Sequence, residues 1–395
     1  MKRPAFLLDR NDNRAILLAG IFSLVVGIGV GRFAFTTLLP PMMEDLLDVR
    51  WTGYLAAANY AGYLSGALFA IFLRDINAKV LWFRVGLALS LAMALVLGLS
   101  RDLELWLVSR VIAGFATAMT MVVGSALVMS KLSYADKTRA MGIHFSGIGI
   151  AILATDLLAK AALALGYSWS DTWLILTAAG VLPALYAYGI LSFDRHVKAR
   201  ATRHRVEPSA FTPFVWILLF AYFTEGVGFV VQATFLPDIV DSIPGLEGMG
   251  AYTWTLVGIA GIVSCILLMR LAHRYGSLRV IVAAMLLQVL GILLPALTQN
   301  LWMVLLSGVI YGGTFVGLVA LILHLGGKIA GPNPVMLMAA LTAVYGIGQV
   351  SAPLYSVALY RSFGSYDAAL WVTAAIVAVG AGVLWRWGRP LAREG

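Results

Sequence analysis

The chain has 395 residues, of which 61% are hydrophobic and only 12% are charged, and its mean hydropathy is +0.90. This composition excludes an ordinary water-soluble globular domain. A formal net charge of +9 would suit a nucleic-acid partner in a soluble protein, but the positions of the cations along this chain explain it more simply, as described below.

Apolar runs recur along the whole length of the chain. About 20 apolar residues in a helix cross roughly 30 Å of hydrocarbon. The runs predict an all-α integral membrane protein with twelve transmembrane helices, at residues 15–41, 52–73, 80–99, 104–130, 138–165, 171–192, 212–238, 250–271, 278–298, 301–326, 334–360 and 367–386.

The chain contains an internal repeat. Residues 29–40 read GVGRFAFTTLLP and residues 226–237 read GVGFVVQATFLP, with six of the twelve positions identical. A second pair follows at nearly the same offset, LVSRVIAG at 107–114 and LLSGVIYG at 305–312. A duplicated half of six helices is typical of secondary transporters, whose binding site lies between the halves near the middle of the bilayer.

One charged segment, FDRHVKARATRHRVEPSAFTP at 193–213, interrupts the apolar pattern. It divides the chain into an N-terminal six-helix bundle at 1–192, a linker at 193–211 and a C-terminal six-helix bundle at 212–395. With the N-terminus inside, 21 lysines and arginines fall on the cytoplasmic side, four on the opposite side and three within helices. The positive-inside rule then places both termini and the linker in the cytoplasm of a bacterium, around its inner membrane. The same bias explains the net charge, so we expect no nucleic-acid partner.

Glycines and prolines mark further features of the helices. Gly147 and Gly149 in the fifth predicted helix match Gly346 and Gly348 in the eleventh, and small residues at this spacing let helix backbones approach closely. Three prolines are expected to end the first and seventh helices at the outer surface, namely Pro40, Pro41 and Pro237. Pro353 lies inside the eleventh helix, where we expect a kink.

The first helix reads GIGVGRFAFTTLLPPM at 27–42, and the seventh carries EGVGF at 225–229 and TFLP at 234–237. These strings are similar to the YbfB/YjiJ-type branch of the major facilitator superfamily, and the likeness covers almost the whole chain. The resemblance implies the major facilitator fold of two pseudo-symmetric bundles and a transport function, without a defined substrate. The chain departs from the superfamily in its cytoplasmic motif, reduced to RDINAK at 74–79 although HRYGSLR at 273–279 is closer, and its fifth helix lacks the proline of the antiporter motif.

Three arginines lie inside predicted helices, where a charge costs several kcal/mol unless it faces protein, water or a partner, and two of them are candidates for binding the solute. Arg32 carries a planar fork of donors suited to a carboxylate, sulfonate or phosphate; alternatively it bonds carbonyl groups of a neighbouring helix. Arg110 corresponds to Gly308 in the repeat, so helix packing does not require the charge. It is a second candidate for binding the solute, unless it reaches the outer interface instead.

Two further groups are candidates for carrying a proton. Glu225 aligns with Ile28, one turn from the level of Arg32, and burial of an acid disfavours its charged form, so we expect it to exchange a proton near neutrality; the alternative is a permanent bridge to Arg32. His144 could titrate in the same range or be simply hydrogen-bonded. Asp156 and Lys160, four residues apart, are expected to form a local ion pair.

Uncharged polar residues at the middle depth of the helices complete the candidate substrate site. Each of them either lines a cavity or bonds across helices. They are Asn59, Tyr63, Gln232, Tyr345 and Gln349.

Other sites are excluded. The GxGxG at 27–31 lies within a transmembrane helix and not at the strand-to-helix turn that a dinucleotide loop requires. No Walker motif, metal-ligand cluster or catalytic triad occurs, and the single Cys265 excludes an internal disulfide. We therefore expect no enzymatic activity, no cofactor and no metal, and ion gradients as the energy source.

The function expected from these residues is proton-coupled transport of a small organic solute, of anionic character, by a monomer that works by alternating access. Two alternatives stay open. One is a proton-driven efflux antiporter for lipophilic or cationic compounds, in which Glu225 attracts the cation. The other is a membrane receptor or scaffold that transports nothing.

Overall fold

The computed structural model describes residues 12–73, 75–132, 137–192, 212–329 and 334–388, and every regular element in this part of the chain is a helix. The predicted linker at 193–211 lies outside the described residues. The helices of the first half are α1 (Asn13–Leu24), η1 (Val25–Phe33), α2 (Ala34–Asp45), α3 (Val49–Phe72), α4 (Ile76–Leu99), α5 (Leu103–Ala118), η2 (Met119–Val123), α6 (Gly124–Lys131), α7 (Lys137–Ala164) and α8 (Trp169–Ile190). Those of the second half are α9 (Pro213–Asp241), α10 (Gly250–Tyr275), α11 (Ser277–Leu297), α12 (Leu301–Ile329), α13 (Pro334–Phe363), α14 (Asp367–Val383) and η4 (Leu384–Gly388).

The predicted membrane-spanning helices are confirmed. The units α1–η1–α2, α5–η2–α6 and α14–η4 each run without a break, and eleven helices among the described residues are long and apolar enough to cross a membrane. The 30-residue helix α13 completes the set of twelve. Large apolar side chains such as Leu182 and Trp302, both 76% exposed, cover the outside of the molecule. Exposed apolar surface of this extent fits contact with lipid and not with water.

Polar side chains define where several helices begin. Asp48, Asp75 and Asp102 each accept a backbone N–H bond at the start of α3, α4 and α5, which satisfies donors that a helix leaves unpaired at its first turn. Ser168 and Asp171 form a reciprocal capping box at the start of α8. Short polar turns therefore separate the long apolar helices.

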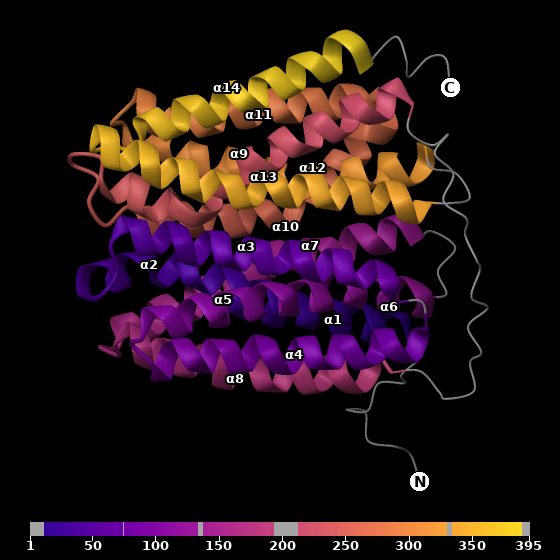
Figure 1. Cartoon of the computed structure of the whole chain (residues 1–395), viewed down its shortest axis with the longest axis horizontal. Coiled ribbons are helices and arrows are strands. Elements are labelled where there is room, and N and C mark those ends of the chain that lie inside the picture. Colours follow the sequence, from indigo (N-terminus) through magenta and orange to yellow (C-terminus); the bar gives the residue numbers. More distant parts are fainter. Residues whose placement is uncertain (1–11, 74, 133–136, 193–211, 330–333, 389–395) are drawn as a thin grey trace.

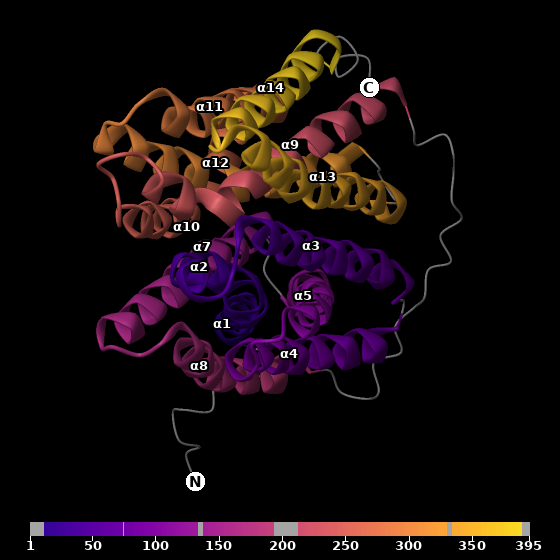
Figure 2. The same ribbon diagram turned by 60° about the vertical axis from the view of Figure 1, so that its left-hand side comes forward.

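The two halves lie side by side, with the helices running along the long axis of the molecule (Figure 1). Turned by 60°, the same view shows α3 and α7 of the first half facing α13 and α10 of the second (Figure 2). The repeated segments form the two innermost helices. Of an apolar stretch of 18 residues, 78% is buried both in α1–η1–α2 and in α9, against 28% in α8. The duplicated sequence thus forms the centre of the bundle.

The glycine pairs lie where the two halves meet. A Cβ atom on Gly149 would lie 2.2 Å from the backbone nitrogen of Ile262 in α10, and one on Gly346 would lie 2.8 Å from Leu64 Cδ1 in α3. Gly147 and Gly348 instead face α1 and α9 of their own halves. The close approach of helices predicted for these residues is confirmed. One glycine of each pair contacts the other half, and the second contacts a helix of its own half.

The prediction that prolines end the first and seventh helices is wrong. Helix α2 continues through Pro40 and Pro41 to Asp45, and α9 continues through Pro237 to Asp241. A proline removes one backbone hydrogen bond, and packing against neighbouring helices offsets this loss inside a bundle. Pro237 is held in this way, because Gly250 packs directly against its carbonyl group. Helix α13 likewise continues through Pro353.

Replacing Gly149 by alanine tests the contact between the halves. The added methyl group would meet the backbone of α10, and overpacking of this kind costs about 1–3 kcal/mol. We expect the midpoint of thermal unfolding of the purified protein to fall by several degrees. Gly189→Ala is the matched control, because nothing lies within 4 Å of its added Cβ. Equal unfolding temperatures for the two variants would contradict this interface.

Candidate functional site

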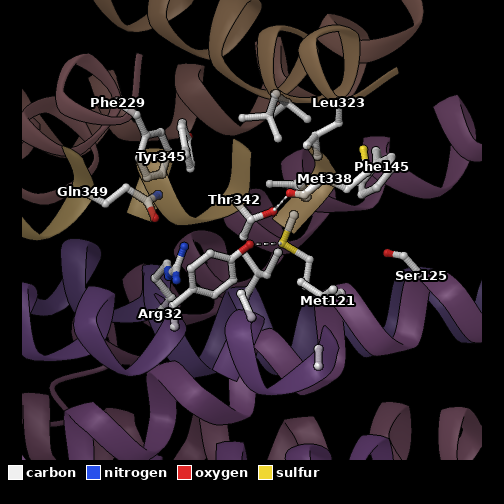
Figure 3. A pocket seen from close by; sticks show the side chains of 18 of the residues that line it. Arg32, Met121, Ser125, Phe145, Phe229, Leu323, Met338, Thr342, Tyr345 and Gln349 are labelled. Atoms are coloured by element: carbon white, nitrogen blue, oxygen red, sulfur yellow. Dashed lines mark hydrogen bonds between the residues drawn. The ribbon is translucent and has the colours of Figure 1, made fainter. Parts of the chain in front are cut away.

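A cavity of about 410 Å³ lies between the two halves at the level of the repeated segments. This volume falls in the range of small-molecule sites, roughly 300–1,000 Å³. Both halves contribute to its wall, which is mostly apolar and aromatic. Its polar side chains are Arg32, Tyr63, Ser125, Tyr222, Thr342, Tyr345 and Gln349 (Figure 3).

Arg32 is the charged residue in the part of this wall that the structure describes. The side chain is only 6% exposed, and its Nε donates a hydrogen bond to Asn59 Oδ1 at 3.3 Å. Its guanidinium carbon lies 4.4 Å from the ring centre of Tyr63 and 4.9 Å from that of Tyr60, so the two rings stabilise the positive charge. Its Nη2 has no hydrogen-bond partner among the described residues. Among the described residues the guanidinium thus donates only through Nε, and its two Nη groups are left for a bound solute.

A π-helix positions Arg32. Segment η1 bonds i to i+5 instead of i to i+4, and such segments often occur at functional sites. Side chains from neighbouring helices bond its carbonyl groups: Thr117 Oγ1 donates to the Gly27 oxygen at 2.8 Å, and Arg110 Nη1 donates to the Gly31 oxygen at 3.3 Å. Helices α3 and α5 thus hold the π-helical segment that carries Arg32.

Arg110 and Asn59 belong to this support and not to the cavity wall. The Arg110 side chain is 3% exposed and lies over the ring of Phe35 at 4.6 Å. Asn59 is fully buried; its Nδ2 donates to the Arg110 backbone oxygen at 3.1 Å while its Oδ1 accepts from Arg32. Direct contact with a solute, predicted for both residues, does not occur in this conformation, because each turns toward the backbone of η1 or α5.

Tyr345 and Gln349 of α13 lie in the wall, as does Tyr63 of α3. The amide of Gln349 approaches Arg32 from the opposite half (Figure 3), and its Oε1 has no partner among the described residues. Tyr345 stacks on Tyr222 with ring centres 4.5 Å apart. The cavity therefore presents unpaired polar groups from both halves at the level of Arg32.

Gln232 does not reach the cavity. Its Nε2 donates to the Gly291 oxygen of α11 at 3.2 Å and to Ser307 Oγ of α12 at 3.0 Å. Residues seven apart on a helix share one side, and Gln232 shares its side of α9 with Glu225. Both face α11, so the sequence placed Gln232 at the correct depth but on the wrong side of its helix.

Glu225 is fully buried and also lies outside the cavity wall. It faces the amide of Gln288 in α11, and neither carboxylate oxygen has a hydrogen bond of ordinary geometry among the described residues. The predicted alternative of a bridge to Arg32 is absent from the ion pairs of the described residues. Tyr311 lies close enough to feel the charges of both Glu225 and Arg32. Glu225 and Arg32 therefore share Tyr311 as a neighbour and form no ion pair with each other among the described residues.

His144 reaches the cavity only through a serine. The imidazole is fully buried in α7, its Nε2 lies 2.8 Å from Ser125 Oγ, and its Nδ1 has no partner among the described residues. Ser125 lies in the cavity wall. A proton carried by His144 would thus pass through one hydroxyl group to reach a solute.

The cavity continues toward one end of the molecule. A second cavity of about 300 Å³ shares Ser125, Phe145 and Met338 with the first, and a third of about 890 Å³ shares His324 and Met269 with the second. The third cavity is lined by Arg270, His273, His324 and Lys328 and, in its described wall, by no acidic residue. These four residues lie at the ends of α10 and α12 where the sequence predicts the cytoplasm.

Hydrogen bonds between the halves close the other end. The predicted ion pair is confirmed, with Lys160 Nζ 2.5 Å from Asp156 Oδ2. Lys160 also donates to the Ala251 oxygen at 2.6 Å and to the hydroxyl of Thr255, both in α10 of the other half. Thr255 in turn donates to Asp156 at 2.6 Å. The pair is therefore part of an interbundle network, which the spacing within one helix could not reveal.

Two threonines of α2 extend this outer closure. Thr36 Oγ1 donates to the Ala233 oxygen of α9 at 2.6 Å, and Thr37 Oγ1 donates to Asp156 Oδ1 at 3.1 Å. The structure is thus closed at the outer end and open toward the end lined by cations.

Several wall residues were missed by the sequence reasoning. Tyr222 and Phe229 lie seven residues apart on α9, a spacing that puts both on one helix face, and Phe229 aligns with Arg32 in the repeat. That alignment could have identified Phe229. Ser125, Phe315 and Thr342 gave no comparable signal, because serine, phenylalanine and threonine are ordinary residues in apolar helices.

Two pseudo-symmetric six-helix halves around a cavity that opens at one end define a multi-pass membrane transporter of the major facilitator type. The chain belongs to the family described as the uncharacterised MFS-type transporter YbfB, which matches residues 24–385. The crystal structure of an aspartate-to-alanine mutant of the nucleoside transporter NupG has the same fold, with a TM-score of 0.75 and 14% sequence identity over 94% of this chain and 99% of that chain. No curated protein matches the chain.

Proposed function

We propose that this protein is a proton-coupled secondary transporter of a small organic anion. It works by alternating access in the inner membrane of a bacterium, as a monomer with both termini and the linker in the cytoplasm. Membership of the family by itself supports a secondary transporter with a small-molecule substrate.

One observation carries the anionic character of the solute: the charge of Arg32 in the cavity wall. An arginine in an apolar cavity without a carboxylate partner is costly unless a ligand compensates it. Its Nη2 is free among the described residues, and the described wall contains no aspartate or glutamate. A cation in this cavity would meet repulsion and no compensating acid, which disfavours the efflux of cationic compounds.

The route to the cavity supports the same conclusion. Arg270 and Lys328 line its inner mouth together with two histidines, and all four side chains are exposed. A mouth lined by one sign of charge raises the local concentration of the opposite ion. An anion would therefore be attracted from the cytoplasmic side in this conformation.

Glu225 supplies the proton in this proposal. A protonated Glu225 leaves Arg32 as the unbalanced charge at the centre, which favours an anion. Loss of the proton makes Glu225 negatively charged. This charge then competes with the solute for the attraction of Arg32. The proton and the anion then favour each other's binding, and reciprocity of this kind couples their transport.

Alternating access requires the outer closure to open. The Asp156–Lys160 network and the threonines of α2 must then exchange their interbundle bonds for water. The ends of the two halves that now line the cytoplasmic opening would approach each other in the same step. Gly149 of α7 and Gly346 of α13 carry no side chain at the contact between the halves, which lets the halves move past each other there.

The first prediction concerns Arg32. Purified wild-type protein should be stabilised against heat by at least one member of a panel of small carboxylates, sulfonates and phosphates, and Arg32→Ala should bind that compound about 10- to 150-fold more weakly, since a hydrogen bond to a charged group is worth roughly 1.5–3 kcal/mol. Arg32→Lys should restore little, because an ammonium group lacks the planar fork.

Arg84→Ala is the matched control for Arg32. It removes another arginine within a membrane helix, one that lies over the ring of Tyr188 at 3.9 Å and away from the cavity. We expect this variant to keep wild-type affinity. Full binding by Arg32→Ala, or stabilisation by cations alone, would refute the anionic solute.

The second prediction concerns Glu225. In proteoliposomes loaded with the anion found above, Glu225→Gln should exchange it across the membrane, because the neutral amide imitates the protonated acid. The variant should fail to accumulate the anion when a pH gradient is imposed, whereas the wild type should accumulate it. Unchanged accumulation would remove Glu225 from the coupling mechanism.

A further inference from the structure

The cavity differs chemically between its two halves. The repeat aligns Arg32 of η1 with Phe229 of α9, and both residues lie in the wall. One half therefore offers a guanidinium at the position where the other offers a phenyl ring (Figure 3). A solute that fills the centre meets the cation of the described wall in the first half, and aromatic rings from both halves, Phe33 and Tyr63 of the first among them.

The aromatic surface is extensive. Phe229 lies 5.3 Å from Phe315 and 6.1 Å from Tyr345, measured between ring centres, and Tyr345 stacks on Tyr222 at 4.5 Å with an interplanar angle of 20°. All four rings belong to the second half and all four line the cavity. Offset-stacked and edge-to-face contacts between rings are worth about 0.5–1.5 kcal/mol beyond the burial of their area.

The packing of these rings is more than filling of the core, because they border empty space. The four rings are only 2–6% exposed and belong to the same buried core as Trp106, Trp173 and Trp254, but those tryptophans lie outside the cavity wall. The four rings instead face a cavity with one cationic side chain in its described part.

We propose that the transported anion is an aromatic carboxylate, with its carboxylate on Arg32 and its ring among Tyr222, Phe229 and Tyr345. This inference rests on the proposed function and specifies its substrate class. The guanidinium of Arg32, which donates only through Nε among the described residues, bonds the carboxylate. The ring spans the gap to the second half, so a single solute touches both halves at once, as a carrier that couples binding to rocking of its halves requires.

Four compounds of nearly equal size distinguish the contribution of the aromatic ring to binding from that of the negative charge. They are benzoate, cyclohexanecarboxylate, benzamide and benzylammonium, each titrated onto the full-length protein in detergent with thermal stability and calorimetry as the readouts. We expect benzoate to bind about five- to tenfold more tightly than cyclohexanecarboxylate, given the energy of one or two ring contacts. Benzamide and benzylammonium should not bind.

Two variants of one residue add a matched control. Tyr345→Leu keeps an apolar side chain without a ring and should weaken benzoate about fivefold more than it weakens cyclohexanecarboxylate. Tyr345→Phe keeps the ring and should weaken benzoate less than Tyr345→Leu does.

The possible failures are distinguishable. Equal affinity for cyclohexanecarboxylate and benzoate, or binding of none of the four compounds, would overturn the aromatic substrate class and leave the anionic transporter to its own test with the wider panel. Binding of benzamide as tight as that of benzoate, or binding of benzylammonium in its place, would overturn the anionic function as well.

Discussion

The arrangement of the site depends on one constraint, the π-helical backbone of η1. A wider helical turn presents carbonyl groups to the side, and Thr117, Arg110 and Asn59 bond them from α3 and α5. Because these three side chains satisfy the backbone, Arg32 does not have to. Its guanidinium rests against two tyrosine rings and one amide, and both of its Nη groups are without hydrogen-bond partners among the described residues. The π-helical geometry of η1 thus keeps the guanidinium of Arg32 available to the cavity at the centre of the transporter.

The two copies of the repeat carry different residues at equivalent positions around the cavity, so the two halves are chemically different there. Arg32 and Phe229 hold equivalent positions, as do Ile28 and Glu225, so the duplicated helices present a cation and a ring to the cavity and keep the acid on the far side of α9. At the outer end, a buried acid and a lysine join the halves instead of a second aromatic layer. The ion pair itself lies within α7, so only its bonds to α10 have to break when the halves separate.

Much of the fold could be predicted from the sequence, because its causes are local. Runs of apolar residues define the spanning helices, the repeat identifies the two central ones, and paired glycines indicate where helices approach closely. Arg32 was predicted for the cavity because a charge in the bilayer needs a partner or water. The prolines of α2 and α9 misled, since a tertiary environment compensates the bond that a proline removes.

What could not be predicted is rotation about a helix axis. Gln232 and Glu225 both face α11 instead of the cavity, and only the packing of the neighbouring helices fixes that direction. The roles of Arg110 and Asn59 depend in the same way on a π-helical segment that no residue pattern announced. Asp156 and Lys160 were recognised as a pair, but their bonds to α10 arise from the meeting of two segments about 90 residues apart.

The most direct measurement of the central claim is the charge selectivity of the cavity. Thr342, which lies in the wall, is replaced by cysteine in a Cys265→Ser background, and the new thiol is modified by methanethiosulfonate reagents bearing either a sulfonate or a trimethylammonium group, each rate being normalised to that of a small thiol in solution. The structure predicts several-fold faster reaction with the sulfonate, and equal rates once Arg32→Gln is added. Equal rates with Arg32 present, or faster reaction with the ammonium reagent, would contradict a solvent-open cavity governed by the Arg32 charge.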